Sequence, residues 1–131
     1  MRDVLIVDDN PDMRGMLGYT LADLGFEVRE AKDGNEALLA LEDAVPDCMV
    51  LDLRMPGLDG FSVLEVMRAR GLAGRMPVVI LSCDDDEKAF VRGWDLGAVE
   101  FLTKPVDPYV LAAKVAAIVD KAERLSSRQP S

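Results

Sequence analysis

Short apolar runs alternate with longer amphipathic stretches along the whole sequence. The runs occupy residues 4–7, 47–51, 78–81 and 99–102, and residues 26–30 form a further predicted strand. Short apolar runs bounded by turn-forming residues are typical of strands that are buried on both faces of a parallel sheet. The stretches between them carry apolar residues at helical spacing. The pattern therefore predicts strands and helices in alternation.

Helix-boundary residues support this alternation. Asn10 predicts an N-cap, Pro11 a first helical position and Asp12 a favourable charge at the positive end of the helix dipole. Gly25 predicts the end of this helix. Further helices are expected over residues 34–44, 61–72 and 107–122, and residues 82–86 are expected to cap a helix that runs to Leu96. The alternation predicts an α/β protein with right-handed βαβ units, in which five helices flank a doubly wound, five-stranded parallel sheet.

Polar residues follow four of the predicted strands. Asp8 and Asp9 come after the first strand, Asp52 after the third, Ser82 after the fourth and Lys104 after the fifth. In a parallel sheet all carboxyl ends lie at one edge, and open α/β sheets bind their ligands there. We therefore expect the three aspartates, the hydroxyl and the lysine to meet at one site.

The residue types at this edge suit phosphoryl transfer to a carboxylate. Asp52 is an anion, so it can attack phosphorus without a general base. Neighbouring aspartates repel one another and repel an incoming phosphoryl group, and a hard divalent cation removes both obstacles. Carboxylate oxygens favour Mg²⁺. Lys104 supplies a positive charge and Ser82 a hydrogen-bond donor for the phosphoryl oxygens.

Composition and charge narrow the function classes. The chain has 131 residues, enough for one domain with a hydrophobic core, and its net charge is −9. This charge argues against direct binding of nucleic acid or of an anionic membrane surface. The chain contains no histidine, which excludes histidine-dependent catalysis and histidine metal ligands. A phosphohistidine donor would therefore belong to a partner protein.

The sequence carries no signal for export or membrane insertion. No apolar stretch is long enough to cross a bilayer, and the N-terminus lacks the layout of a signal peptide. We therefore expect a cytoplasmic protein. Cys48 and Cys83 are expected to be reduced and mostly buried thiols rather than a disulfide, because they lie at opposite ends of their strands.

These motifs together carry a family resemblance. They are Asp8-Asp9, Asp52, Ser82, Lys104-Pro105, the loop at residues 55–60 and Asp33-Gly34. The set resembles the receiver domain of two-component response regulators. The resemblance implies a flavodoxin-like sheet with strand order 2-1-3-4-5, an order known from a chemotaxis receiver. We expect residues 1–125 to form the receiver domain and residues 126–131 a polar tail or the start of a linker to an effector domain.

The resemblance also implies a metal site and a backbone geometry. Asp9, Asp52 and the backbone carbonyl of Arg54 would ligate Mg²⁺ directly, and Asp8 would act through water. The Lys104-Pro105 bond would be cis, so that the lysine points into the site. Only about 5–6% of X-Pro bonds in folded proteins are cis, so this expectation differs from the usual geometry.

The implied function is a phosphorylation-activated signalling switch. A sensor histidine kinase or a histidine phosphotransfer protein would donate the phosphoryl group to Asp52. The domain would be a signalling module rather than a metabolic enzyme, catalysing only its own phosphorylation and slow dephosphorylation. Ser82 and Phe101 take the positions of the family's switch residues. Arg54 and Asp84 take the positions that flank the phosphoryl group and tune its lifetime.

The expected output face comprises the fourth helix, the fifth strand and the fifth helix. The fourth helix carries two apolar sets, Ala89, Gly93 and Leu96 and, rotated from them, Phe90, Val91 and Trp94. One helix packed on a sheet cannot easily bury both sets. We expect the second set to contact a partner or a second copy of the chain on activation. The alternative is that Trp94 folds back over a neighbouring element.

Two other function classes share parts of this pattern. A flavin- or nucleotide-binding domain of the same topology would need a loop rich in Gly, Ser or Thr after the first strand, where Asp8 and Asp9 stand. A phosphatase with an aspartyl nucleophile would need a second carboxylate two residues after it, where Arg54 stands. Neither class fits as well as the signalling switch.

The output of the switch stays open. The Gly97-Ala98 turn is similar to that of receivers that dimerise and carry DNA-binding domains. Phe101 and Lys114, however, stand where that subgroup usually has a tyrosine and an arginine.

Overall fold

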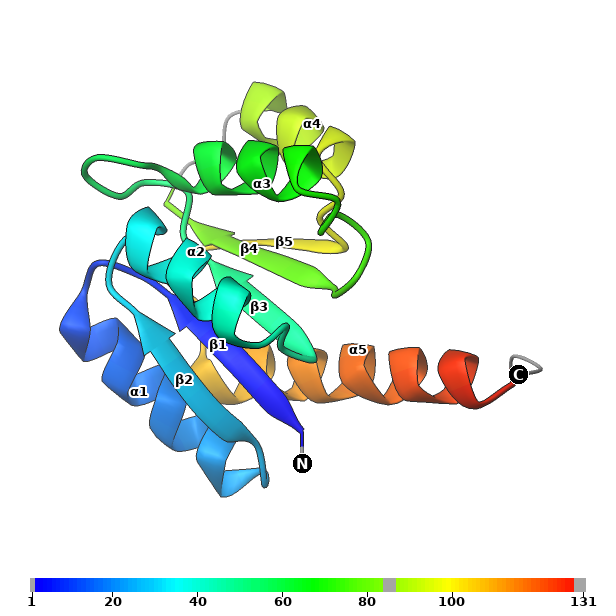
Figure 1. The fold of residues 1–131 in the computed structure, drawn as a ribbon. Helices are drawn as coiled ribbons and strands as arrows, with labels where there is room; N and C mark the ends of the chain where they lie inside the picture. The colour runs from blue at the N-terminus through cyan, green and yellow to red at the C-terminus, as the bar shows by residue number, and fades with distance from the viewer. Residues whose placement is uncertain (1, 84–86, 129–131) are drawn as a thin grey trace.

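Five parallel strands lie in the order β2-β1-β3-β4-β5 at the centre of the protein, as predicted (Figure 1). The computed structural model describes residues 2–83 and 87–128. The strands are β1 (Asp3–Val7), β2 (Glu27–Ala31), β3 (Cys48–Leu51), β4 (Val78–Ser82) and β5 (Glu100–Thr103). The helices are α1 (Pro11–Asp23), α2 (Gly34–Asp43), α3 (Gly60–Ala69), α4 (Glu87–Asp95) and α5 (Pro108–Arg128).

Helices cover both faces of the sheet and divide the core into two layers. Alternate residues of a strand point to opposite faces, so Val4 and Ile6 pack under α1 and α5, whereas Leu5 and Val7 pack under α2 and α3. The central strands are buried on both faces, which explains why they read as continuous apolar runs. Among the described residues, no helix is both long and apolar enough to cross a membrane.

Short polar side chains start the first three helices. The Asn10 side chain accepts hydrogen bonds from the backbone N–H groups of Asp12 and Met13, as its cap position predicts. Asp33 and Asp59 cap α2 and α3 in the same way. These caps fix where the loops at the carboxyl edge of the sheet end, and therefore the shape of the site above that edge.

Some details differ from the prediction. β2 and β5 each lie one residue later than expected, at Glu27–Ala31 and Glu100–Thr103. α5 continues to Arg128, into the segment predicted to be a polar tail, because no Gly or Pro lies between Pro108 and Pro130. Cys83 is exposed, whereas Cys48 is buried. Cys83 lies one residue beyond the end of β4, so the helices that cover the strand no longer cover it.

Candidate functional site

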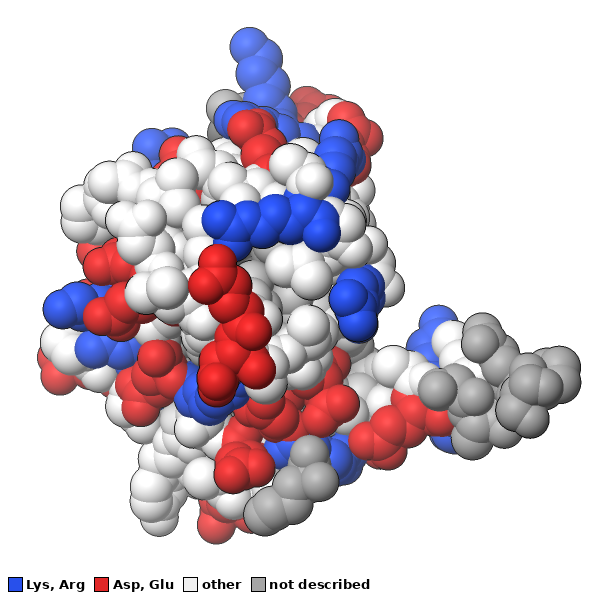
Figure 2. Space-filling model, in the orientation of Figure 1, with Lys and Arg blue, Asp and Glu red and all other residues white. Residues whose placement is uncertain are grey.

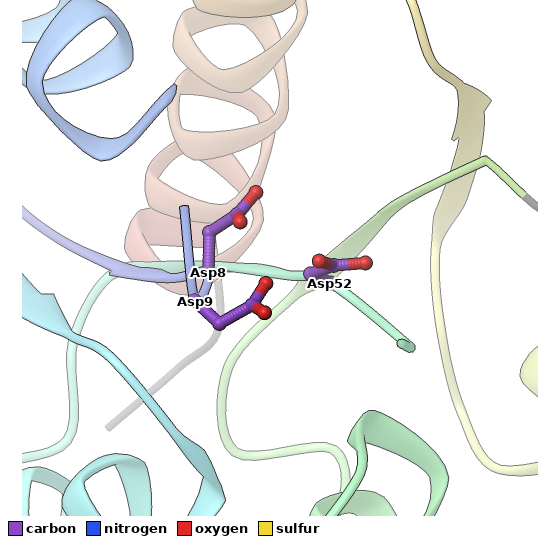
Figure 3. Close-up of side chains that lie close together, drawn as sticks. All are labelled: Asp8, Asp9 and Asp52. Carbon is purple, nitrogen blue, oxygen red and sulfur yellow. The ribbon is translucent and has the colours of Figure 1, made fainter. Parts of the chain in front are cut away.

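The three predicted aspartates meet at the carboxyl edge of the sheet (Figure 3). Asp8 and Asp9 follow β1, and Asp52 follows β3, the strand that pairs with β1. One carboxylate oxygen of each residue lies within 4.8 Å of the others. The chain leaves β1 toward β2 on one side and returns at β3 on the other, so the cluster occupies the point where the strand order reverses.

The two buried aspartates are held in place by hydrogen bonds. Asp8 and Asp52 are 2% and 4% exposed, whereas Asp9 is exposed. Asp8 accepts a bond of 2.9 Å from the backbone N–H of Asn10 and another of 2.9 Å from Lys104 Nζ. Asp52 accepts a hydrogen bond of 3.1 Å from the backbone N–H of Arg54 and another of 3.4 Å from Lys104 Nζ. The lysine therefore bridges the two buried carboxylates.

Lys104 reaches this position from the far side of β4. Its backbone N–H donates to the carbonyl of Ser82 over 2.8 Å, and the Lys104-Pro105 peptide bond is cis, which confirms the predicted geometry. Its side chain is only 14% exposed. The bridge across to Asp8 spans most of the chain in sequence, so the ion pair joins the ends of β1 and β5 over β3 and β4.

The pKa values of Asp52 and Lys104 are both raised, but for different reasons. Burial raises the pKa of the Asp52 carboxyl, and the Asp8 charge adds to this rise, while Lys104 and the Arg54 N–H group lower the pKa without cancelling the effect. Burial by itself lowers the pKa of Lys104, but its hydrogen bond to Asp8 and the charges of Asp52 and Asp8 outweigh it, so this pKa is raised. The site therefore holds more negative charge than its single lysine compensates.

Ser82 lies on β4 and Phe101 on β5, the two strands beyond β3 in the sheet. Ser82 is fully buried at the end of β4 and is paired in register with Thr103. Phe101 is 6% exposed, and its ring stacks on that of Phe90 with 4.0 Å between centroids. The structure thus separates the set predicted on α4. Phe90 is partly buried against the core, whereas Val91 and Trp94 are 54% and 46% exposed.

The loop that follows Asp52 borders a cavity of about 460 Å³, which is lined by Leu53, Arg54, Met55, Pro56, Asp59 and Phe61. Asp84, the predicted counterpart of Arg54 in tuning phosphoryl lifetime, lies outside the described residues. Sequence reasoning missed Arg14, which donates a hydrogen bond of 2.7 Å to the backbone carbonyl of Asp8. No motif marks this contact, because its acceptor is a backbone atom.

Comparison with known proteins gives one consistent picture. The sequence profile of the response regulator receiver domain matches residues 4–116. The chain is 38% identical to the alkaline phosphatase synthesis transcriptional regulatory protein PhoP of Bacillus subtilis, over 93% of this chain and 50% of that protein. It is 32% identical to the phosphate regulon transcriptional regulatory protein PhoB of Escherichia coli, over 90% of this chain and 52% of that protein. The chain therefore spans about half the length of the curated relatives it matches.

Solved structures show the same fold. The chemotaxis protein CheY4 of Vibrio cholerae superimposes with a TM-score of 0.83 at 32% identity, over 90% of this chain and 98% of that one. The receiver domain of the Francisella response regulator 1452 superimposes with a TM-score of 0.86 at 30% identity, over 93% and 99%. Both structures cover nearly the whole chain.

Proposed function

This chain belongs to the response regulator receiver domain family, and we propose that Asp52 is the acceptor of its activating phosphoryl group. One observation carries the proposal. Asp52 lies at the reversal point of the strand order, with two further aspartates and the Lys104 ammonium around it. A nucleotide- or flavin-binding role is not favoured, because Asp8 and Asp9 stand where a phosphate-binding loop would be needed.

The donor set suits a magnesium ion. The clustered oxygens all belong to carboxylates, which are the ligands that Mg²⁺ prefers, and three carboxylates beside one lysine favour a bound cation. Asp9, Asp52 and the carbonyl of Arg54 would hold the ion, with Asp8 contributing through water. When bound, Mg²⁺ neutralises the repulsion between the carboxylates and the phosphoryl oxygens.

The residues of the chain itself then account for the transfer. The Asp52 carboxylate attacks the phosphorus of a partner's phosphohistidine, and a phosphorus–oxygen bond forms while the phosphorus–nitrogen bond breaks. Lys104, already between Asp8 and Asp52, shifts its hydrogen bonds to the phosphoryl oxygens. Ser82, at the end of β4, donates to another of these oxygens. The donor is a sensor histidine kinase or a histidine phosphotransfer protein, since this chain has no histidine.

The lifetime of the phosphoryl group is set by the residues at the mouth of the site. We assign this role to Arg54, two residues after Asp52, together with Asp84. Attraction between their opposite charges would hinder attack by water. Arg54 is exposed, and an ion pair of an exposed side chain is worth about 0–1 kcal/mol. Arg54→Ala should therefore lose phosphate modestly faster. Equal lifetimes in the wild type, Arg54→Ala and Asp84→Ala would exclude this role.

The signal leaves the site through β5 and α4. Movement of Ser82 toward the phosphoryl group would free space that the Phe101 ring can enter, and Phe90 would follow because the two rings are stacked. The exposed pair Val91 and Trp94 lies on the same helix and would form the surface that a partner or a second copy contacts.

The full protein is proposed to control transcription in the cytoplasm. The matched relatives are named as transcriptional regulators, and each is about twice as long as this chain. This domain itself is not expected to contact nucleic acid. Its net charge is −9, and the face in Figure 2 shows acidic and basic side chains interspersed rather than a continuous basic patch. Lys114 stands where receivers that dimerise and carry DNA-binding domains usually have an arginine. In this chain it lies 3.8 Å from Glu100 of the same chain, so both residues already have a partner.

Phosphorylation with a small phosphodonor tests the acceptor assignment. In the presence of Mg²⁺, intact mass spectrometry should show one added phosphoryl group in the wild type and none in Asp52→Asn. Asp12→Asn is the matched control, because Asp12 is an exposed aspartate of the nearby first turn of α1 and lies outside the cluster. Asp9→Asn should weaken metal binding. Phosphorylation of Asp52→Asn at the wild-type rate would overturn the assignment.

A further inference from the structure

Arg14 is the one basic residue of α1, and it reaches back to the loop that carries the metal-binding aspartates. Its Nη1 atom donates to the backbone carbonyl of Asp8 over 2.7 Å, and its Nε atom lies 3.3 Å from a carboxylate oxygen of Glu30 on β2. The arginine side chain is 17% exposed. The guanidinium therefore contacts Glu30 with one nitrogen and the backbone of Asp8 with another.

The three aspartates of the site differ in how they are held. Asp8 and Asp52 each accept hydrogen bonds on both carboxylate oxygens. The Asp9 side chain is exposed and makes no hydrogen bond or ion pair with any part of the chain that the structure describes. Its position is therefore set by the backbone and by its own rotamers, without help from a neighbouring side chain.

The contact of Arg14 fixes the part of the backbone on which Asp9 depends. The Asp8 carbonyl belongs to the peptide group that joins Asp8 to Asp9, and that group is planar. A hydrogen bond to its oxygen restrains the orientation of this peptide plane. It thereby restrains the direction in which the Asp9 side chain leaves the backbone. The other end of Asp8 is held by its own N–H, which donates to Ala31 over 3.1 Å.

We propose that Arg14 is a positioning residue that preorganises Asp9 for the divalent cation by holding the Asp8–Asp9 peptide. The proposal rests on the proposed function, because it concerns the same cation site. It adds a residue that neither ligates the cation nor touches the phosphoryl group. Glu30 acts one step further away, by limiting the rotamers that the Arg14 side chain can adopt.

Charge and position predict opposite results when Arg14 is neutralised. If Arg14 acted only through its positive charge, its loss would remove a repulsion, and the cation would bind more tightly. If Arg14 positions Asp9, its loss frees the peptide, and the cation binds more weakly. The loss of one hydrogen bond corresponds to about a three- to tenfold weaker affinity. The sign of the change therefore separates the two roles.

The test is binding of Mg²⁺ to the full chain by isothermal titration calorimetry, with Mn²⁺ binding followed by electron paramagnetic resonance as a second readout. We expect Arg14→Met to weaken binding about three- to tenfold, Arg14→Lys to weaken it less, and Glu30→Gln to have the smallest effect. Arg70→Met, which removes another arginine paired with a glutamate far from the site, is the matched control and should bind as the wild type does. Urea unfolding of each variant shows that the folded fraction is unchanged.

A double-mutant cycle with Asp9→Asn identifies the residue through which Arg14 acts. The effect of Arg14→Met should shrink in the Asp9→Asn background, because the ligand that it positions is already weakened. An equal effect in both backgrounds, or unchanged or tighter binding in Arg14→Met, would overturn the proposal. Absence of cation binding by the wild type would instead contradict the proposed function, so the two failures are distinguishable.

Discussion

Gly60 lies directly against the backbone of Asp52: a Cβ atom at Gly60 would come within 2.5 Å of the Asp52 carbonyl oxygen and 2.8 Å of the Leu53 Cα atom. The Gly60 N–H also donates to the Leu53 carbonyl over 3.0 Å. The start of α3 therefore packs directly against the end of β3 and Asp52, the proposed phosphoryl acceptor. A side chain at this position would have to displace backbone, which cannot move without moving Asp52.

Gly60→Ala is therefore expected to destabilise the domain by about 1–3 kcal/mol or more, the usual cost of overpacking a site that cannot relax. It should also slow phosphorylation, because the acceptor loop is displaced. Gly15→Ala is the matched control, since a Cβ at Gly15 meets nothing within 4 Å. That change should stabilise α1 by up to about 1 kcal/mol. Urea unfolding measures both, and equal effects of the two substitutions would contradict the argument.

Arg92 ties α4 to α3 by two contacts. It forms an ion pair of 2.5 Å with Glu65 and lies 4.3 Å from the centre of the Phe61 ring. Both charged side chains are about half exposed, so the ion pair contributes about 0–1 kcal/mol and the cation–π contact about 0.5–1 kcal/mol. Arg70 forms a similarly exposed pair with Glu42.

Arg92→Ala should therefore cost about 0.5–2 kcal/mol of unfolding free energy, more than Arg70→Ala, whose pair is worth about 0–1 kcal/mol. The difference is the contribution of the aromatic ring. Chemical denaturation in low salt, repeated in high salt, measures it, because salt screens the ion pairs. If Arg70→Ala is as costly as Arg92→Ala, the Phe61 contact contributes nothing measurable.

The sequence predicts those parts of the fold and site that depend on neighbours along the chain. Asp8, Asp52 and Ser82 could be placed because each directly follows an apolar run, and strand ends share one edge in a parallel sheet. The separation of Phe90 from Trp94 could not be predicted from the sequence, because the rotation of α4 depends on the Phe101 ring beneath it. Contacts to backbone atoms, such as the hydrogen bond from Arg14 to the Asp8 carbonyl, cannot be predicted from the pattern of residue types.

The same reason applies to two glycines that the sequence shows only as parts of motifs, in Asp33-Gly34 and in the loop at residues 55–60. Gly34 and Gly60 are both needed for close approach of the backbone. A Cβ at Gly34 would come within 2.4 Å of the Leu58 carbonyl oxygen, which belongs to the loop after β3. That contact joins segments distant in the sequence, and only the packed structure reveals it.

Stability should depend on the ionisation of Asp52. Because burial raises its pKa in the folded state, the folded protein holds a proton there that the unfolded chain has already released. The free energy of unfolding therefore falls as pH rises from the ordinary value of 3.8 through the raised pKa, and the deficit persists at neutral pH. Asp52→Asn removes this ionisation.

In metal-free buffer at neutral pH, Asp52→Asn should therefore have a higher Tm than the wild type, and the difference should shrink as the pH is lowered below the ordinary pKa of aspartate. Saturating Mg²⁺ should reverse the order, because the ion stabilises only a protein that binds it. Differential scanning calorimetry across this pH range measures both effects. A Tm advantage that does not change with pH would show that ionisation of Asp52 is not its source.

The two cysteines should differ in reactivity. Burial raises the pKa of the Cys48 thiol to about 12, with a smaller contribution from Asp47, whereas Cys83 is exposed. The thiolate is the reactive form, so Cys48 is protected by both protonation and burial. At pH 8 a thiol reagent should label one cysteine in the native protein and two after denaturation, with peptide mapping assigning the first to Cys83. Rapid labelling of Cys48 in the native protein would contradict this.

The last prediction concerns the exposed apolar pair on α4. Trp94 is the only tryptophan of the chain, so its fluorescence reports on this surface alone. Trp94 is 46% exposed and Val91 54% exposed, while the adjacent residue Gly93 faces the sheet so closely that a Cβ would come within 2.8 Å of the Ile80 side chain. The helix therefore cannot rotate to bury Trp94 without losing this packing.

Acrylamide should therefore quench Trp94 readily in the unphosphorylated monomer. If the pair is the surface that a partner or a second copy covers, phosphorylation at concentrations that allow association should reduce quenching and raise the apparent mass in sedimentation. Val91→Ser should weaken both changes, because it removes apolar area from the contact. Tyr19→Ser, which alters an exposed aromatic of α1 outside the expected output face, is the control. Unchanged quenching in a protein shown to be phosphorylated and associated would place the contact surface elsewhere, because a covered indole cannot keep its access to a neutral quencher.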